Sequence, residues 1–236
     1  RRMKRFVHGR VLFAGDSAHL VSPFGARGCN GGFADIDNLG WKLDLVLRGE
    51  AGEALLESYN DEAIATADEN ILNSTRSTDF LTPKTTVSKA FRDAVLELAS
   101  TEAFARPFVN SGRLSTAIHY PQSSLNTPDV HAWNGGVAPG SPALDAPVND
   151  AWLLPQLGGR FVLLANGWTQ SVPAEVELVD IAQWPGDHSL LQSRYALQSG
   201  CGYLIRPDHY VAARWQSPVS AAAVQASVAR AKGMSQ

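Results

Sequence analysis

Residues 8–43 read HGRVLFAGDSAHLVSPFGARGCNGGFADIDNLGWKL, and this stretch decides the fold. Its early part, residues 11–14, is a short apolar run typical of a parallel strand that is buried on both faces. Gly15 and Asp16 end the run. Because ligands of open α/β sheets bind beyond the carboxyl ends of the strands, Asp16 is predicted to face a ligand.

A glycine-containing loop over residues 17–27 follows and leads into a predicted amphipathic helix. A carboxylate at a strand end can accept hydrogen bonds from a polyol, and glycines let backbone N–H groups approach a planar ring. The start of a helix adds roughly half a positive charge. Together these features suit a flavin, with its ribityl chain at Asp16 and its pyrimidine edge at the loop. The apolar face predicted for the helix consists of Phe33, Ile36, Leu39, Leu43, Val46 and Leu47.

The same residues carry a family resemblance. GRVLFAGDSAH at residues 9–19, followed by PFGARGCNGGFADIDNLGWKL at residues 23–43, resembles the second FAD-binding motif of flavin-dependent aromatic hydroxylases. These are class A monooxygenases of the para-hydroxybenzoate and phenol hydroxylase type. In that family the aspartate contacts the ribityl chain, and a Pro-x-Gly-x-x-Gly-x-Asn loop lies along the isoalloxazine. The FAD-binding residues that this resemblance implies are Asp16, Pro23, Gly25, Ala26, Arg27, Gly28, Cys29 and Asn30.

Length and composition are those of an ordinary globular protein. The 236 residues suffice for one large or two small domains, and 44% of them are hydrophobic. A formal net charge of −3 gives no electrostatic argument for nucleic-acid binding, and no apolar run reaches the roughly 18 residues of a membrane span. Cys29 and Cys201 are too few for a disulfide scaffold or a zinc site, so both are predicted to be free thiols in a cytoplasmic protein.

The fold class is predicted to be α/β, with residues 1–115 forming the C-terminal portion of an FAD-binding domain. Apolar periodicity predicts helices over residues 52–80 and 87–99, and a shorter one around residues 102–108 that Pro107 weakens. These helices are expected to complete the domain around the predicted flavin site, and we predict no metal site.

Two further parts follow along the chain. Residues 116–150 are rich in Pro, Gly, Ser and Asn, which predicts a linker or wrapping segment, pinned by Trp133. Residues 151–236 are predicted to form a thioredoxin-like domain, although it lacks a C-x-x-C motif and therefore the residues for thioredoxin-type redox chemistry. Its predicted elements are strands at 161–165 and 176–181, a hairpin of 203–206 with 210–215, and a helix over 220–232 capped by Ser220.

The resemblance implies an FAD-dependent monooxygenase that uses NAD(P)H and hydroxylates a phenolic or related aromatic substrate. The dinucleotide fingerprint G-x-G-x-x-G does not occur in the sequence, and family members place it far upstream of the second motif. We therefore expect this chain to be the C-terminal part of such an enzyme and to be inactive alone. Catalytic residues are expected upstream of Arg1, and the small domain is expected to support a homodimer.

Two other functions fit parts of the sequence. One is a non-catalytic dimerisation or interaction module. The other is an esterase, because Gly15-Asp16-Ser17 also opens the motif of Gly-Asp-Ser hydrolases. Such a serine needs a histidine base that an aspartate orients. The only Asp-x-x-His spacing in the chain is Asp16 to His19, inside the motif itself, and His19 is expected to hydrogen-bond loop backbone instead.

Overall fold

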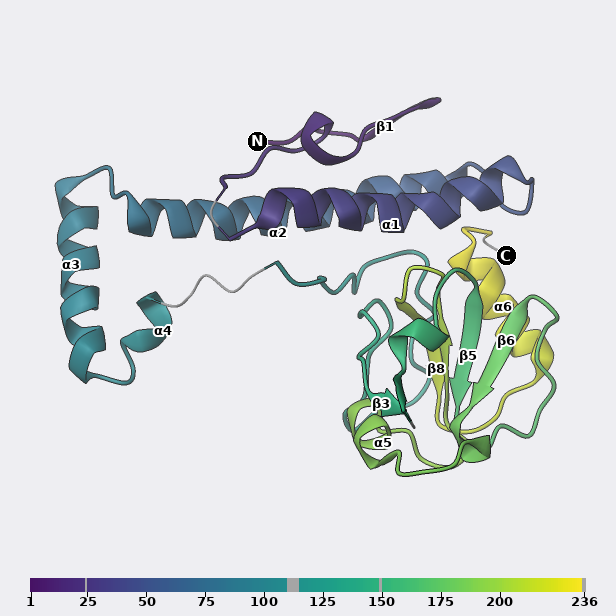
Figure 1. Cartoon of the computed structure of the whole chain (residues 1–236). Helices are drawn as coiled ribbons and strands as arrows, with labels where there is room; N and C mark the ends of the chain where they lie inside the picture. Colours follow the sequence, from purple (N-terminus) through teal and green to yellow (C-terminus); the bar gives the residue numbers. More distant parts are fainter. Residues whose placement is uncertain (24, 110–114, 149, 235–236) are drawn as a thin grey trace. The chain divides into compact units, whose positions relative to one another are not determined.

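The computed structural model describes residues 1–23, 25–109, 115–148 and 150–234 (Figure 1). Its contacts define two compact units, and each is described by itself. Unit 1 comprises residues 1–36 and 62–117, whereas unit 2 comprises residues 37–61 and 118–236. The mixed α/β class is the predicted one. The units differ from the predicted boundaries, because residues 37–61 and the whole segment from 118 to 150 join the C-terminal part.

The N-terminus of unit 1 forms a small hairpin. Strand β1 (Val7–His8) pairs antiparallel with β2 (Val11–Leu12), and the 3-10 turn η1 (Gly15–Ser17) follows. The expectation of a buried parallel strand over residues 11–14 is wrong, since Val11 is 55% exposed and pairs with β1. The reason is local. Gly9 has a φ of 59°, which closes a tight turn and brings the preceding residues alongside.

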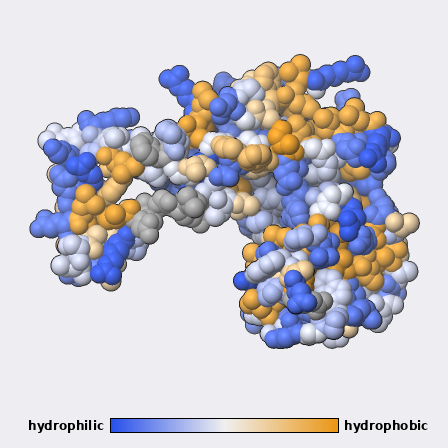
Figure 2. All heavy atoms as spheres, viewed as in Figure 1, coloured by the Kyte–Doolittle hydropathy of each residue, from blue (hydrophilic) through white to orange (hydrophobic). Residues whose placement is uncertain are grey.

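Most of the remaining described residues of unit 1, and the first part of unit 2, are helical. They are α1 (Arg27–Leu47), α2 (Ala54–Leu81), α3 (Thr86–Thr101) and α4 (Arg106–Val109). The helix predictions for 52–80 and 87–99 are confirmed within two residues. Thr85 caps α3 by accepting a hydrogen bond from the Ser88 N–H at 3.1 Å. Apolar side chains gather on the surface of the α3–α4 segment (Figure 2), including Phe91, Phe104 and Phe108.

Helix α1 buries the opposite face from the predicted one. Phe33 and Ile36 are exposed by 69% and 60%, and Leu47 by 77%. Of the predicted stripe, Leu39 is buried. The helix instead buries four polar side chains, and each of them has a polar partner within its own unit. These buried polar residues of α1 are Arg27, Asp35, Asn38 and Lys42.

Unit 2 is built on a four-stranded sheet whose order is β6-β5-β7-β8. The neighbours β5 and β6 run parallel, and the other two pairs are antiparallel. One hydrophobic cluster lies against α6, with Trp41 and Leu45 of α1 packed on it, and a second cluster includes residues of α5. The strands are β5 (Phe161–Ala165), β6 (Val176–Asp180), β7 (Gly202–Ile205) and β8 (Val211–Trp215), and the helices are α5 (Ser189–Tyr195) and α6 (Ala221–Ala231).

The predicted strands, hairpin and C-terminal helix of this unit are all present, and Ser220 accepts the predicted capping bond from the Ala223 N–H at 3.3 Å. A short hairpin, β3 (Pro147–Val148) with β4 (Ala151–Trp152), precedes them. The connection from β5 to β6, residues 166–175, contains no helix. The thioredoxin-like assignment stays a prediction.

The segment predicted to be a linker wraps unit 2 as an extended chain. Trp133 packs on the sheet's core, and the Arg214 guanidinium lies 4.4 Å from its ring centroid. Tyr120 stacks on Tyr210 with ring centroids 4.8 Å apart. Both cysteines are free, with Cys29 exposed and Cys201 buried, and burial raises the pKa of the Cys201 thiol. A raised thiol pKa leaves Cys201 a poor nucleophile.

Candidate functional site

The predicted ribityl contact, Asp16, lies in the middle of the turn η1 and is exposed. Gly15, which precedes it, has a φ of 59° that favours glycine. The Gly15 carbonyl accepts hydrogen bonds from the N–H groups of Ala18 and His19, both at 2.9 Å. The turn is thus internally closed, and its acidic side chain points away from the core.

The glycine loop reaches α1 through two residues with left-handed backbone. Gly25 has a φ of 87° and Ala26 a φ of 52°, and α1 begins at Arg27. Asn30 donates from Nδ2 to the Ala26 carbonyl at 2.6 Å, which ties the loop to the first helical turn. Exposed predicted site residues therefore line both the loop and the helix start: Asp16, Pro23, Ala26, Cys29 and Asn30.

Glycines bring the turn and the helix start together. A Cβ added at Gly32 would lie 3.6 Å from the Gly15 Cα, so the two backbones approach closely. Gly28, another predicted site residue, is half-buried against Val21. The structure therefore brings Asp16 and the N-terminal end of α1 into one neighbourhood, as the flavin interpretation requires.

Arg27 is the predicted site residue whose side chain points inward. It is 3% exposed, and its Nη1 donates to the Asn70 Oδ1 of α2 at 3.1 Å. The guanidinium is thereby held inside unit 1. The FAD contact predicted for Arg27 consequently rests on its backbone N–H at the start of the helix.

His19 has a partner that the sequence analysis missed. Its Nε2 lies 2.7 Å from Asp35 Oδ2, and both side chains are 1% exposed. The imidazole thus bonds to a helix carboxylate and not to loop backbone. Ser17 Oγ donates to the Ala14 carbonyl at 2.7 Å, so the contacts of the turn include no Ser–His pair that would support the esterase alternative. The polar residues at positions 35, 38 and 42, spaced by three and four, were the sequence signal that could have pointed to Asp35.

A second buried polar cluster lies in unit 2, at the β7–β8 hairpin. Arg206 donates to Asp208 Oδ1 from Nε at 2.9 Å and to Oδ2 from Nη2. Asn38 Nδ2 reaches Asp208 Oδ2 at 3.5 Å, and Lys42 Nζ donates to Asn38 Oδ1 at 2.8 Å. The Arg206 guanidinium also lies 5.3 Å from the Trp41 ring centroid. This cluster fixes the hairpin on the unit 2 part of α1.

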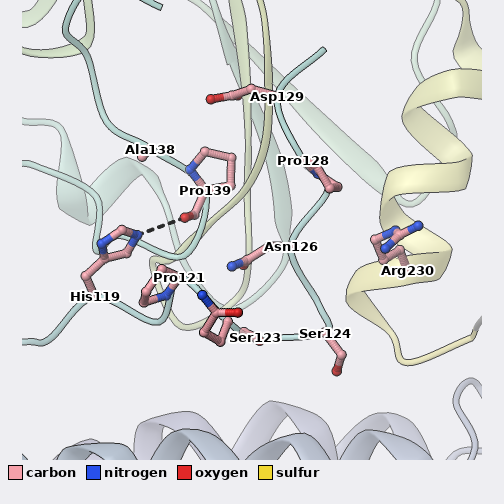
Figure 3. A pocket seen from close by; sticks show the side chains of 11 residues that line it. His119, Pro121, Ser123, Ser124, Asn126, Pro128, Asp129, Ala138, Pro139 and Arg230 are labelled. Atoms are coloured by element: carbon pink, nitrogen blue, oxygen red, sulfur yellow. Dashed lines mark hydrogen bonds between the residues drawn. The ribbon is translucent and has the colours of Figure 1, made fainter. Parts of the chain in front are cut away.

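Unit 2 also carries an open hollow of about 440 Å³ (Figure 3). The wrapping segment and Arg230 of α6 line it, and His119 Nε2 bonds to the Pro139 carbonyl at 3.0 Å on its rim. In the described part of the chain, no group of three or more His, Cys, Asp or Glu side chains is placed to hold a metal ion. Nor does any described helix have the length and apolar character to cross a membrane.

Residues 1–74 match the FAD binding domain family. The match covers the hairpin, the Asp16 turn, the loop and α1. The chain is similar to FAD-dependent aromatic monooxygenases over the parts of those proteins that it spans. Over its whole length it is 32% identical to the uncharacterized aromatic compound monooxygenase YhjG of Bacillus subtilis (strain 168). Over 155 residues it is 34% identical to a 3-(3-hydroxy-phenyl)propionate/3-hydroxycinnamic acid hydroxylase of Mycolicibacterium smegmatis, covering 66% of the chain and 26% of that hydroxylase.

Solved structures agree with this relationship. The rebeccamycin biosynthetic enzyme RebC with reduced flavin superposes with a TM-score of 0.68 at 28% identity. The superposition covers 98% of this hydroxylase-related chain and 46% of RebC. The chain likewise spans 45% of the Bacillus protein, so it corresponds to about half the length of these relatives.

Proposed function

We propose that this chain supplies the flavin-ring and ribityl contacts of an FAD-dependent, NAD(P)H-using monooxygenase that hydroxylates a phenolic or related aromatic substrate. The observation that carries the proposal is the place of Asp16. The family match covers it, and the structure exposes it beside the glycine loop and the start of α1. The names of the relatives, aromatic compound monooxygenase and hydroxyphenylpropionate hydroxylase, support the substrate class.

The described residues fit a flavin. The Asp16 carboxylate is free of the core and can accept hydrogen bonds from ribityl hydroxyls, and the turn packs on the helix through Gly15 and Gly32 without side chains between them. The N–H groups at the start of α1 can meet the electron-rich edge of the ring. Bound FAD would supply the redox and oxygen-transfer chemistry. The chain's own residues would bind and orient it.

We further propose that the FAD pyrophosphate and adenosine are held by residues outside these 236. The chain spans 45% of the Bacillus relative, and its sequence contains no G-x-G-x-x-G fingerprint. The substrate-contacting and catalytic residues belong to that same outside region, and the working protein is a cytoplasmic homodimer. On this proposal the 236-residue chain alone retains no FAD and consumes no NADPH.

The test is an FAD titration of the full-length gene product, with the 236-residue chain as a second sample. Asp16→Ala removes a charge-assisted hydrogen bond worth about 1.5–3 kcal/mol, which weakens FAD binding roughly ten- to a hundred-fold. The matched control is Asp44→Asn, at an exposed aspartate of the same helix-bearing segment. Unchanged FAD affinity in Asp16→Ala would contradict the ribityl assignment. Stoichiometric flavin on the 236-residue chain after desalting would contradict the divided site.

A further inference from the structure

The turn that carries Asp16 is fixed from outside by a buried side-chain pair. Asp35 Oδ2 accepts a hydrogen bond from the Gly15 N–H at 2.8 Å and lies 2.7 Å from His19 Nε2. His19 returns to the same turn through its own N–H, which donates to the Gly15 carbonyl at 2.9 Å. One carboxylate oxygen of α1 therefore holds both ends of the turn, with Asp16 between them.

The pair is enclosed, since both side chains are 1% exposed. The Phe6 ring stacks on the His19 ring with centroids 5.9 Å apart. A Cβ added at Gly31 of α1 would lie 3.1 Å from His19 Cε1, so the glycine at this position leaves room for the imidazole beside the helix. The imidazole is thus packed where it can bond to Asp35, which also holds the Gly15 N–H.

The pair is not built for stability alone. Within the described residues, His19 Nδ1 and Asp35 Oδ1 are buried without a hydrogen-bond partner. Buried polar atoms that lack partners offset much of what a buried ion pair contributes. Such groups in a folded protein call for an explanation beyond packing. The explanation that the geometry offers is the fixed position of the neighbouring turn.

We propose that His19 and Asp35 are positioning residues that set the Gly15–Ser17 turn, and with it the Asp16 carboxylate, for the flavin ribityl chain. The inference rests on the proposed FAD site and deepens it. Asp16 makes the contact, whereas His19 and Asp35 act through Gly15. The turn is presented to the cofactor already in its bound conformation, which lowers the ordering cost of binding.

The experiment compares His19→Leu with His19→Gln in the full-length gene product. Leucine fills the space but cannot bond to Asp35, whereas the glutamine amide can donate to the carboxylate from a similar position. FAD affinity by fluorescence titration should fall about ten-fold or more in His19→Leu. His19→Gln should restore most of it. The exposed Asp44→Asn serves as control for a charge change that does not touch the turn.

A double-mutant cycle separates positioning from a general loss of structure. In the Asp16→Ala background, His19→Leu should cause little further loss of FAD affinity, because the pair acts through Asp16. The midpoint of thermal unfolding should show no such coupling. If His19→Leu does not fold, Asp35→Asn, which closely matches the shape of the aspartate, takes its place in the cycle with Asp16→Ala.

The outcomes are distinguishable. Additive losses in the cycle, or native FAD affinity in His19→Leu while Asp16→Ala binds weakly, would overturn the positioning role and leave the proposed function standing. If Asp16→Ala itself binds FAD normally, the proposed FAD site fails, and this inference fails with it. Coupled losses that His19→Gln relieves would establish the role.

Discussion

Each unit contains a buried carboxylate that is paired with a basic side chain, Asp35 with His19 in unit 1 and Asp208 with Arg206 in unit 2. The two pairs differ in how many of their polar atoms have hydrogen-bond partners. In unit 1, Asp35 holds His19 and the Gly15 N–H through one oxygen, and two buried atoms of the pair have no partner among the described residues. In unit 2, Arg206 donates hydrogen bonds to both carboxylate oxygens of Asp208, and the Asn38 amide donates a further one to Oδ2.

This difference indicates what each pair contributes. A bidentate guanidinium–carboxylate pair with aromatic faces on Arg206 is fully engaged, and such networks fix one arrangement of the backbone around them. It holds the turn between β7 and β8, where both residues lie. The incomplete pair in unit 1 stabilises less and instead controls the position of one exposed carboxylate. The stability that a buried pair contributes therefore depends on whether all of its polar atoms have hydrogen-bond partners. The burial of the pair alone does not predict that contribution.

We expect the largest effect from a variant that breaks the Arg206–Asp208 pair. Arg206→Met leaves the buried Asp208 carboxylate without its guanidinium, which should lower the free energy of unfolding by about 3–5 kcal/mol. Urea denaturation followed by circular dichroism measures it. Arg48→Met is the control, since Arg48 pairs with Asp44 on the surface and should cost at most about 0.5 kcal/mol. A loss below about 1 kcal/mol in Arg206→Met would mean that the two pairs do not differ as described.

We expect a smaller effect from backbone strain, which can be compared at one alanine in each unit. Ala26 in the glycine loop and Ala196 at the C-cap of α5 both have left-handed φ values, 52° and 47°. Replacing either by glycine relieves about 1–2 kcal/mol of strain. Glycine also destabilises by about 0.5–1 kcal/mol, because it loses more backbone entropy on folding than alanine does. Each variant should therefore be more stable by roughly 0.5–1 kcal/mol in urea denaturation.

The control for this comparison has the opposite sign. Ala65 is exposed inside α2, where glycine should destabilise by about 1 kcal/mol. A gain at Ala196 together with a loss at Ala26 would show that the loop of unit 1 needs the alanine side chain. In that case contacts of the Ala26 methyl group would outweigh the backbone strain of the loop.

Elements with a local signal were predictable from the sequence. The five apolar residues 161–165 form β5 as expected, and Ser220 caps α6 because its hydroxyl reaches an N–H three residues on. The Asp16 turn was predicted to be a site because its residues carry both suitable chemistry and a motif, and that assignment stays a prediction. The residue pattern also gave the helices over 54–81 and 86–101 nearly to their ends.

Features that depend on distant partners were not predictable. Val11 pairs with β1 because of a turn at Gly9, which the apolar run alone does not reveal. Periodicity predicted an apolar face of α1, but Leu39 is buried while Phe33, Ile36 and Leu47 are exposed, and the buried polar face was not predicted. Asp35 bonds to His19, which is 16 positions away in the sequence, and no short-range sequence pattern predicts that contact. The structure was therefore needed to identify the side-chain partners, whereas most helices and strands could be predicted from the sequence.

The smallest effect concerns Asp37, which begins unit 2 on α1 two residues after Asp35. Burial raises the pKa of the Asp37 carboxyl above its ordinary 3.8, and the negative charge of Asp208 adds to this, while His209 and Arg206 oppose it. A carboxyl with a raised pKa in the folded state binds protons more tightly there than in the unfolded chain. Its ionisation therefore lowers stability as the pH rises from about 3.8 through the folded-state pKa, and the loss is constant above that.

Asp37→Asn should accordingly be more stable than the native protein at pH 7, and the difference should shrink as the pH falls toward 4. The measurement is the free energy of unfolding in urea at several pH values between these limits. Asp44→Asn is the matched control, because its exposed pair with Arg48 should contribute no more than about 0.5 kcal/mol at any of them. If Asp37→Asn were instead less stable at neutral pH, the attraction of Arg206 and His209 would outweigh burial and the Asp208 charge. The cluster in unit 2 would then extend to Asp37 as a further carboxylate held by charge, and the contrast with the incomplete pair in unit 1 would become sharper.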